Sequence, residues 1–149
     1  MKRVYLDVCC LCRPFDDQSQ HRIRQEIEAV SAIYRRVEEG EALLVASSVV
    51  LYEVSRIADQ ERSDKIRSLV ESLSVVIELG EEEVARANEL VSLGFSALDA
   101  RHVACAEAGK VEVFLTTDDR LVRTAARSNV SLALRVLNPV DWLNELDGT

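Results

Sequence analysis

Short apolar runs alternate with longer segments of mixed polarity along the whole chain. The short runs are rich in Val, Ile and Leu, and runs of this length and composition are typical of buried strands. The predicted strands are residues 3–6, 42–46, 74–79, 111–115 and 132–137.

The longer segments show the spacing of amphipathic helices. Residues 21–38 are the clearest, because Ile23, Ile27 and Val30 recur on one helical face, and Gly40 follows where helix ends favour glycine. The other predicted helices run from Ser47 or Ser48 to about Ala58, from Glu61 to Ser72, from Glu81 to Ser92, from Ser96 to near Gly109, from Asp118 to about Arg127, and from Pro139 through Leu146.

Residues 8–20 are predicted to be a loop, because Pro14 and the pair Asp16-Asp17 are turn signals. Elsewhere the alternation of strands and helices favours a parallel sheet with helices on both faces. We therefore predict an α/β fold, a three-layer α/β/α arrangement with a five-stranded parallel sheet. The 149 residues contain no linker or repeat, so residues 1–149 are expected to form a single domain.

Two acids are expected at one edge of this sheet. Ligands of a parallel sheet bind at the carboxyl ends of its strands. Asp7 ends the first predicted strand and Asp118 follows the fourth. An acid in such a place can also satisfy loop amides or cap the next helix. Asp119 offers a second carboxylate, and the choice between it and Asp118 stays open, although Asp118 is nearer the strand end.

Glu53 is predicted to face inward from its helix. It shares a helical face with Val49 and Ile57, which belong to the core side. A charge that points inward must be paired or must bind a cation. An ion pair with Arg56 is the structural alternative.

Asp99 has two compatible interpretations. The segment Ser96-Ala97-Leu98-Asp99 matches a helix-capping pattern, and Asp99 also shares an inward face with Val103. One turn on, His102 could contact a substrate, although a hydrogen-bonded structural histidine is the favoured interpretation.

The carboxylates of Asp7, Glu53, Asp99 and Asp118 in one pocket would form a cation site. Two like charges about 4 Å apart repel by roughly 4 kcal/mol at an effective dielectric of 20, so such a cluster requires a cation or a bound proton. Ligands that are all oxygen favour Mg²⁺ or Mn²⁺ over Zn²⁺. Such an ion can activate water and neutralise charge on a phosphodiester.

Composition narrows the function further. The net charge of −8 argues against broad binding to duplex nucleic acid. The four cysteines are expected to be reduced thiols that pack as small apolar residues. No apolar run reaches the roughly 20 residues of a membrane span and no signal peptide is evident, so a cytoplasmic location is expected.

Taken together, several segments resemble the PIN-domain family, specifically its small single-domain toxins of the VapC type. The matching segments are Val4-Tyr5-Leu6-Asp7, Arg13-Pro14-Phe15, residues 48–53, Ala97-Leu98-Asp99-Ala100 and Phe114-Leu115-Thr116-Thr117-Asp118. Their order and spacing fit the family over nearly the whole chain. After the first aspartate the family often carries Thr-Asn, where this chain has Val8-Cys9.

The resemblance implies a PIN fold and an endoribonuclease that depends on Mg²⁺ or Mn²⁺ and hydrolyses RNA. The family's acidic metal-binding and catalytic positions match Asp7, Glu53, Asp99 and Asp118. Thr116 matches its hydroxyl position and is expected to bind the substrate, and Arg13 is expected to contact RNA phosphates. A toxin of this type further implies a small antitoxin protein as partner and a homodimer.

Two other functions compete with this hypothesis. A catalytically silent PIN-like module that binds RNA or protein would keep the fold without turnover, and metal-stimulated cleavage separates the two. A phosphoacceptor receiver domain also gathers acids at strand ends, but it requires a lysine just after the last strand. This chain has Leu137-Asn138-Pro139 there.

Overall fold

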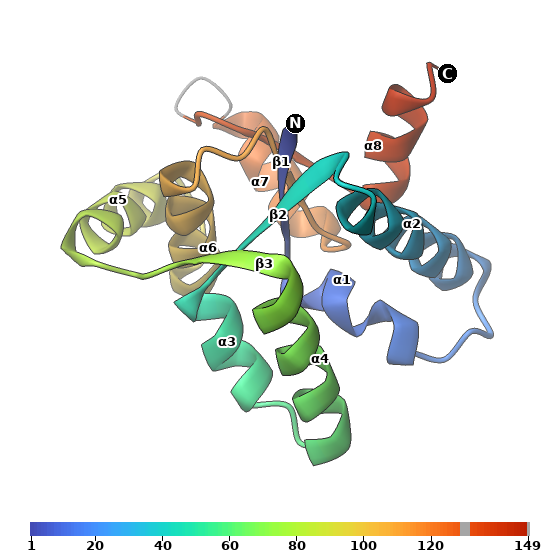
Figure 1. The fold of residues 1–149 in the computed structure, drawn as a ribbon. Coiled ribbons are helices and arrows are strands. Elements are labelled where there is room, and N and C mark those ends of the chain that lie inside the picture. Colours follow the sequence, from blue (N-terminus) through green and yellow to red (C-terminus); the bar gives the residue numbers. More distant parts are fainter. Residues whose placement is uncertain (129–131, 149) are drawn as a thin grey trace.

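A computed structural model describes residues 1–128 and 132–148, and its centre is one parallel sheet (Figure 1). The strands are β1 (Lys2–Leu6), β2 (Ala42–Ser47), β3 (Ser74–Ile77), β4 (Val113–Leu115) and β5 (Arg135–Leu137). Their order across the sheet is β3-β2-β1-β4-β5, and every pair of neighbours is parallel. The predicted α/β fold with a five-stranded parallel sheet is confirmed.

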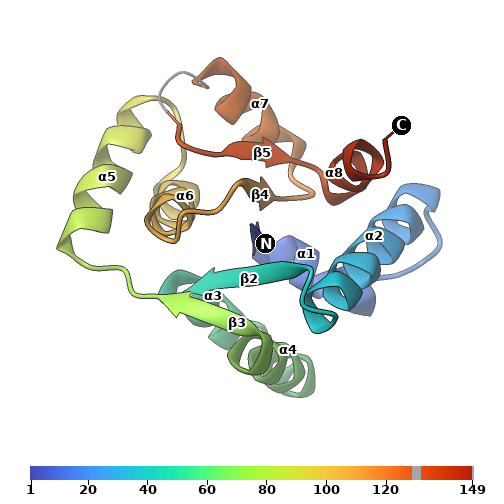
Figure 2. The ribbon, with the colours of Figure 1, turned by 45° about the horizontal axis from the view of Figure 1, so that its top comes forward.

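Helices cover both faces of the sheet, as buried parallel strands require. They are α1 (Val8–Cys12), the 3-10 helix η1 (Arg13–Phe15), α2 (His21–Glu38), α3 (Ser48–Ser55), α4 (Gln60–Leu73), α5 (Glu81–Ser92), α6 (Ala97–Ala108), α7 (Asp119–Arg127) and α8 (Pro139–Leu146). Figures 1 and 2 show α2, α4 and α8 on one side of the sheet and α5, α6 and α7 on the other. Right-handed crossovers explain this split. The chain moves across the sheet from β1 to β2 and β3, and then passes back over β1 to β4 and β5, so the later connecting helices lie on the opposite face. No helix in the described ranges is both long and apolar enough to cross a membrane.

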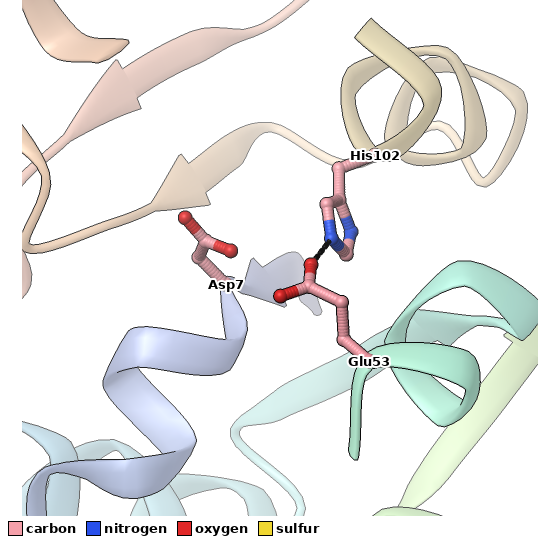
Figure 3. Close-up of side chains that lie close together, drawn as sticks. All are labelled: Asp7, Glu53 and His102. Carbon is pink, nitrogen blue, oxygen red and sulfur yellow. Dashed lines mark hydrogen bonds and ion pairs between the residues drawn. The ribbon is translucent and has the colours of Figure 1, made fainter. Parts of the chain in front are cut away.

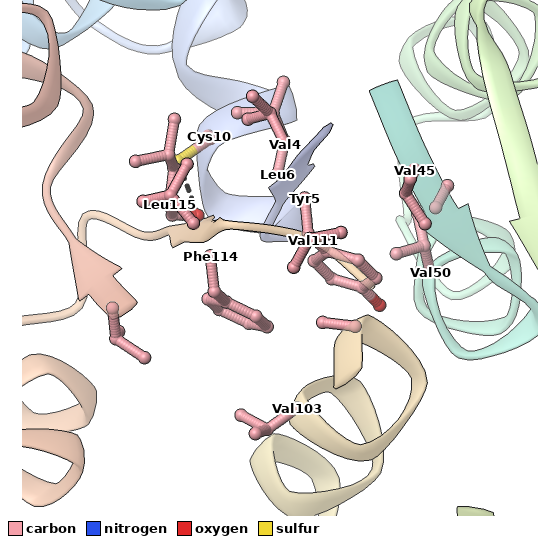
Figure 4. Close-up of a cluster of buried hydrophobic side chains, with 14 of the residues drawn as sticks. Val4, Tyr5, Leu6, Cys10, Val45, Val50, Val103, Val111, Phe114 and Leu115 are labelled. Carbon is pink, nitrogen blue, oxygen red and sulfur yellow. Dashed lines mark hydrogen bonds between the residues drawn. The ribbon is translucent and has the colours of Figure 1, made fainter. Parts of the chain in front are cut away.

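The middle strands carry the centre of the core (Figure 4). Val4, Tyr5 and Phe114 are completely buried, and the Tyr5 ring stacks on Phe114 with centroids 4.9 Å apart. Each such side chain contributes about 2 kcal/mol through removal of apolar surface from water. The β1–β4 pairing therefore places the carboxyl ends of both strands at a rigid point of the molecule.

The prediction of a loop over residues 8–20 is wrong at its start. Residues 8–12 form α1, whose first N–H group, that of Val8, donates to the Asp7 carboxylate at 2.8 Å. Cys10 and Leu11 are buried against the core, and Pro14 lies inside η1. A helix of five residues is too short to show a helical period, so the prediction followed the turn signals that come after it.

Most other boundaries differ from prediction by a few residues. The helix expected to reach Ala58 ends at Ser55, because the N–H of Arg56 turns back to the carbonyl groups of Glu53 and Val54. The strands expected at residues 111–115 and 132–137 are confined to Val113–Leu115 and Arg135–Leu137. These shifts leave every candidate acid on the element that the sequence assigned to it.

Candidate active site

Asp7 lies where β1 ends and α1 begins, at the carboxyl edge of the sheet. Its side chain is 8% exposed and is held at both oxygens. Oδ1 accepts the Val8 N–H, and Oδ2 accepts the hydroxyl of Thr116 at 2.8 Å. Asp7 is therefore a fixed carboxylate rather than a mobile surface acid.

Glu53 reaches the same place from α3 and meets His102 from α6 (Figure 3). Oε1 of Glu53 is hydrogen-bonded to Nε2 of His102, and one ligand atom from each of Asp7, Glu53 and His102 lies within 4.8 Å of the other two. The expected alternative, an ion pair between Glu53 and Arg56, is not what the structure shows. The guanidinium of Arg56 lies over the ring of Tyr52, 5.8 Å from its centroid.

Asp99 and Asp118 line a neighbouring hollow of about 430 Å³, together with Arg120. Asp99 is half-buried in the first turn of α6, and the hydroxyl of Ser96 caps its N–H as the sequence pattern predicted. Asp118 is the N-cap of α7, where its Oδ1 accepts the N–H groups of Arg120 and Leu121. The two acids thus face one cavity from different elements.

Thr116 joins the two parts of this acidic cluster. Its hydroxyl donates to Asp7, and the same oxygen accepts the N–H of Asp118 at 3.1 Å. Cys9, which stands where the family often has a polar residue, places its sulfur 3.4 Å from this hydroxyl and accepts the Thr117 N–H. Thr116 and Cys9 are thus part of the polar framework around Asp7.

The acids at this edge influence one another electrostatically. Burial raises the pKa of Asp7, the contacts with His102 and Thr116 oppose that rise, and the negative charge of Glu53 adds to it. Burial is also the largest cause of the raised pKa of Asp99, and the charges of Asp7 and Asp118 add to it. A cation among these oxygens would remove the repulsion, so the carboxylates gathered at this edge fit a divalent metal ion.

Two residues considered as site members are engaged elsewhere. Both carboxylate oxygens of Asp119 accept from the guanidinium of Arg22, at 2.7 and 2.9 Å, and Asp119 is exposed. Arg13 donates to Glu26 at 2.9 Å and to Asp16 at 2.7 Å. Asp118 thus lines the hollow beside Asp99 while Asp119 binds Arg22, and Arg13 holds η1 to α2.

Sequence reasoning missed the hydrogen-bond chain behind Glu53. His102 is bonded at Nδ1 to the Tyr5 hydroxyl, which is bonded in turn to Ser47, both at 2.7 Å. The sequence indicated that His102 is a hydrogen-bonded structural histidine, but it did not identify the partners. No pattern along the chain, however, pairs a residue of β1 with one of α6.

Comparisons with known proteins agree with this fold. The family model described as the PIN domain matches residues 4–127. No curated protein matches the sequence.

Solved structures with the same fold include two VapBC complexes. One is VapBC2 from Rickettsia felis bound to a DNA fragment from their promoter, with 16% identity and a TM-score of 0.56 over 91% of this chain and 98% of that chain. The other is VapBC-1 from nontypeable Haemophilus influenzae, with 17% identity and a TM-score of 0.57 over 93% of this chain and 98% of that chain. At these identities the likeness shows the fold.

Proposed function

The chain belongs to the PIN-domain family, a family of nucleases, and on this premise we propose that it is an endoribonuclease that depends on Mg²⁺ or Mn²⁺. The observation that carries the proposal is the meeting of Asp7 with Glu53, and of Asp99 with Asp118, at one edge of the sheet. Asp7 follows β1 and Asp118 follows β4, the adjacent strands between which the chain reverses its direction across the sheet. Such a switch point is where open α/β sheets bind their ligands.

The acids have distinct tasks in this proposal. Asp7 and Glu53 would hold the divalent ion, and Asp99 and Asp118 would complete an acidic pocket with room for a second. A bound ion supplies Lewis-acid stabilisation of the phosphodiester and a water of lowered pKa. Asp99 or Glu53 orients the attacking water, and Thr116 keeps the Asp7 carboxylate in place through its hydroxyl.

Arginines without a carboxylate partner are the best candidates for RNA phosphates. Arg13 is occupied by Glu26 and Asp16, so substrate contact by its guanidinium requires those bonds to break. Arg120 lines the hollow beside Asp99 and Asp118. It forms no ion pair with any residue in the described ranges, 1–128 and 132–148. We therefore assign the phosphate contact first to Arg120 and retain Arg13 as a secondary candidate.

The proposal extends to a toxin of the VapC type. Its support is the earlier resemblance together with the two VapBC complexes of the same fold. In this role the protein acts in the cytoplasm, forms a homodimer and is held inactive by a small antitoxin protein. A basic side chain of the antitoxin that enters the acidic pocket would be an effective inhibitor there.

Cleavage of a single-stranded RNA by the purified protein, with and without Mg²⁺ or Mn²⁺, tests the proposal. Asp7→Asn should reduce the metal-dependent rate by about 10²-fold or more. Asp147→Asn is the matched control, because Asp147 contacts Arg36 far from the site at the end of α8. Cleavage by Asp7→Asn at the parent's rate contradicts the proposal, and RNA binding without any metal-stimulated cleavage favours the catalytically silent module.

A further inference from the structure

The carboxylate of Glu53 is held differently from those of Asp7 and Asp118. Asp7 and Asp118 are short side chains fixed by neighbouring N–H groups. Glu53 has a longer side chain, and in the described part of the chain the one hydrogen bond of its carboxylate is with His102. Its direction toward Asp7 therefore depends on that histidine.

His102 is itself held from behind by buried groups. Its side chain is 1% exposed, and the Tyr5 and Ser47 residues that follow it in the hydrogen-bond chain are completely buried. Ser47 is the N-cap of α3, and its oxygen accepts the Val50 N–H at 3.2 Å. This series of hydrogen bonds thus starts at Ser47, the N-cap of α3, and returns through Tyr5 of β1 and His102 of α6 to Glu53, nearly two turns further along α3.

The two ring nitrogens of His102 have different partners, Glu53 at Nε2 and the Tyr5 hydroxyl at Nδ1. A carboxylate is an acceptor, so Nε2 of His102 donates to Glu53. The bond at Nδ1 holds the ring from the other side, so the two contacts together fix the ring orientation of His102.

This arrangement leaves one oxygen of Glu53 for a cation. Oε1 is bound to His102, and Figure 3 shows the second carboxylate oxygen pointing toward Asp7. We propose that His102, supported by Tyr5 and Ser47, is a positioning residue that presents Glu53 to the divalent ion. The inference rests on the proposed metal site and extends it to residues that support a metal ligand without binding the ion themselves.

Binding of Mn²⁺ to the metal-free protein, measured by titration without RNA, tests this role. His102→Leu should weaken Mn²⁺ binding by about 10-fold or more, as loss of a hydrogen bond to a metal ligand commonly does. His102→Gln, whose amide can still donate to Glu53, should recover most of that affinity. His21→Gln is the matched control, because His21 is the other histidine and lies exposed at the start of α2.

Two readouts separate positioning from other roles. A histidine that serves only the fold would lower the melting temperature in His102→Leu and leave the Mn²⁺ dissociation constant unchanged, which overturns the inference. A nitrogen coupling in the electron spin echo of the bound Mn²⁺, lost in His102→Leu, would make His102 a ligand and also overturn it. Should His102→Leu fail to fold, Tyr5→Phe must weaken binding in the same direction.

The parent protein separates this inference from the proposed function. If the parent does not bind Mn²⁺, the metal site and the positioning role both fail. If the parent binds Mn²⁺ and His102→Leu binds it equally well, the positioning role alone fails.

Discussion

Two adjacent residues, Asp118 and Asp119, are both exposed aspartates but have different partners. Asp118 caps α7 and lines the hollow that it shares with Asp99, whereas Asp119 is bound to Arg22 at both oxygens. This arginine also lowers the pKa of Asp119, so its carboxylate stays charged and engaged. The difference makes the pair a matched test of which carboxylate serves the metal.

We expect Asp118→Asn to reduce metal-dependent RNA cleavage by about 10²-fold and Asp119→Asn to change it by less than about 3-fold. Asparagine caps a helix as well as aspartate does, so α7 should remain intact in the first variant. Cleavage rates at saturating Mg²⁺, with circular dichroism as the control for folding, make the comparison. Equal losses in both variants would contradict the assignment of Asp118.

The raised pKa values of Asp7 and Asp99 predict how pH and metal act together. A raised pKa means that the folded protein holds the proton more tightly than the unfolded chain. The stability from these groups is therefore present below the ordinary aspartate range and is lost as pH rises through the raised values. A divalent ion that binds the charged carboxylates would compete with that proton.

We therefore expect Mg²⁺ or Mn²⁺ to raise the melting temperature more at about pH 8 than at about pH 5, where bound protons begin to compete. The measurement is a thermal melt with and without the ion at several pH values. Asp7→Asn should show a smaller dependence on pH. A metal-induced shift that is larger at the acidic end would contradict the account.

The sequence revealed the acids more readily than their partners. Asp7 and Asp118 could be located because strand ends are visible as ends of apolar runs. Glu53 could be located because its face of the helix is otherwise apolar. The contact of Glu53 with His102 could not, because it depends on how α3 and α6 approach each other across the edge of the sheet.

At the scale of elements, a buried acid ties three segments together. Glu26 of α2 is 1% exposed and accepts from Arg13 of η1, from Arg22 and from Asn138, the N-cap of α8. A buried charge is tolerated only with such partners, and loss of one side of a buried ion pair commonly costs 3–5 kcal/mol. Glu26 therefore fixes the segment that follows α1 beside the site.

Glu26→Ala should lower the free energy of unfolding by about 3 kcal/mol, because it leaves the guanidinium of Arg13 without its buried partner. Urea unfolding measures the change. Glu28→Ala, on the exposed face of the same helix, is the control and should change stability by less than about 0.5 kcal/mol. Similar values for both variants would show that the Glu26 network does not support the fold.

Long elements were predictable and short ones were not. α2 and α5 have the predicted bounds because capping and periodicity agree over many residues. α1 has five residues, depends on the Asp7 side chain for its start and gains stability from the burial of Leu11. Such a helix is stabilised by tertiary contacts, which no local pattern encodes.

At the scale of the whole molecule, the strand order brings acids that are far apart in the sequence to one edge of the sheet. β1 lies in the middle of the sheet, between β2 and β4, so the segments after all three strands meet around Asp7. The alternation of strands and helices predicted parallel strands and hence a common edge. It did not predict the order, which is set by long-range pairing and by the packing of α6 against β2 and β3.

We propose that the chain is one domain, because all described helices pack around a single sheet. Thermal unfolding followed by far-ultraviolet circular dichroism and by Trp142 fluorescence should give one transition at the same temperature. Trp142 is 6% exposed on α8, so its fluorescence reports packing near the C-terminus. Two separated transitions would contradict a single cooperative unit.

The central claim is that the carboxylates at this edge hold a divalent ion. Anomalous diffraction from crystals of the protein soaked in Mn²⁺ tests it most directly. The account predicts an anomalous peak at coordination distance, roughly 2 Å, from carboxylate oxygens of Asp7 and Glu53. Crystals that bind Mn²⁺ only elsewhere, with the edge between Asp7 and Glu53 free of anomalous density, would contradict it.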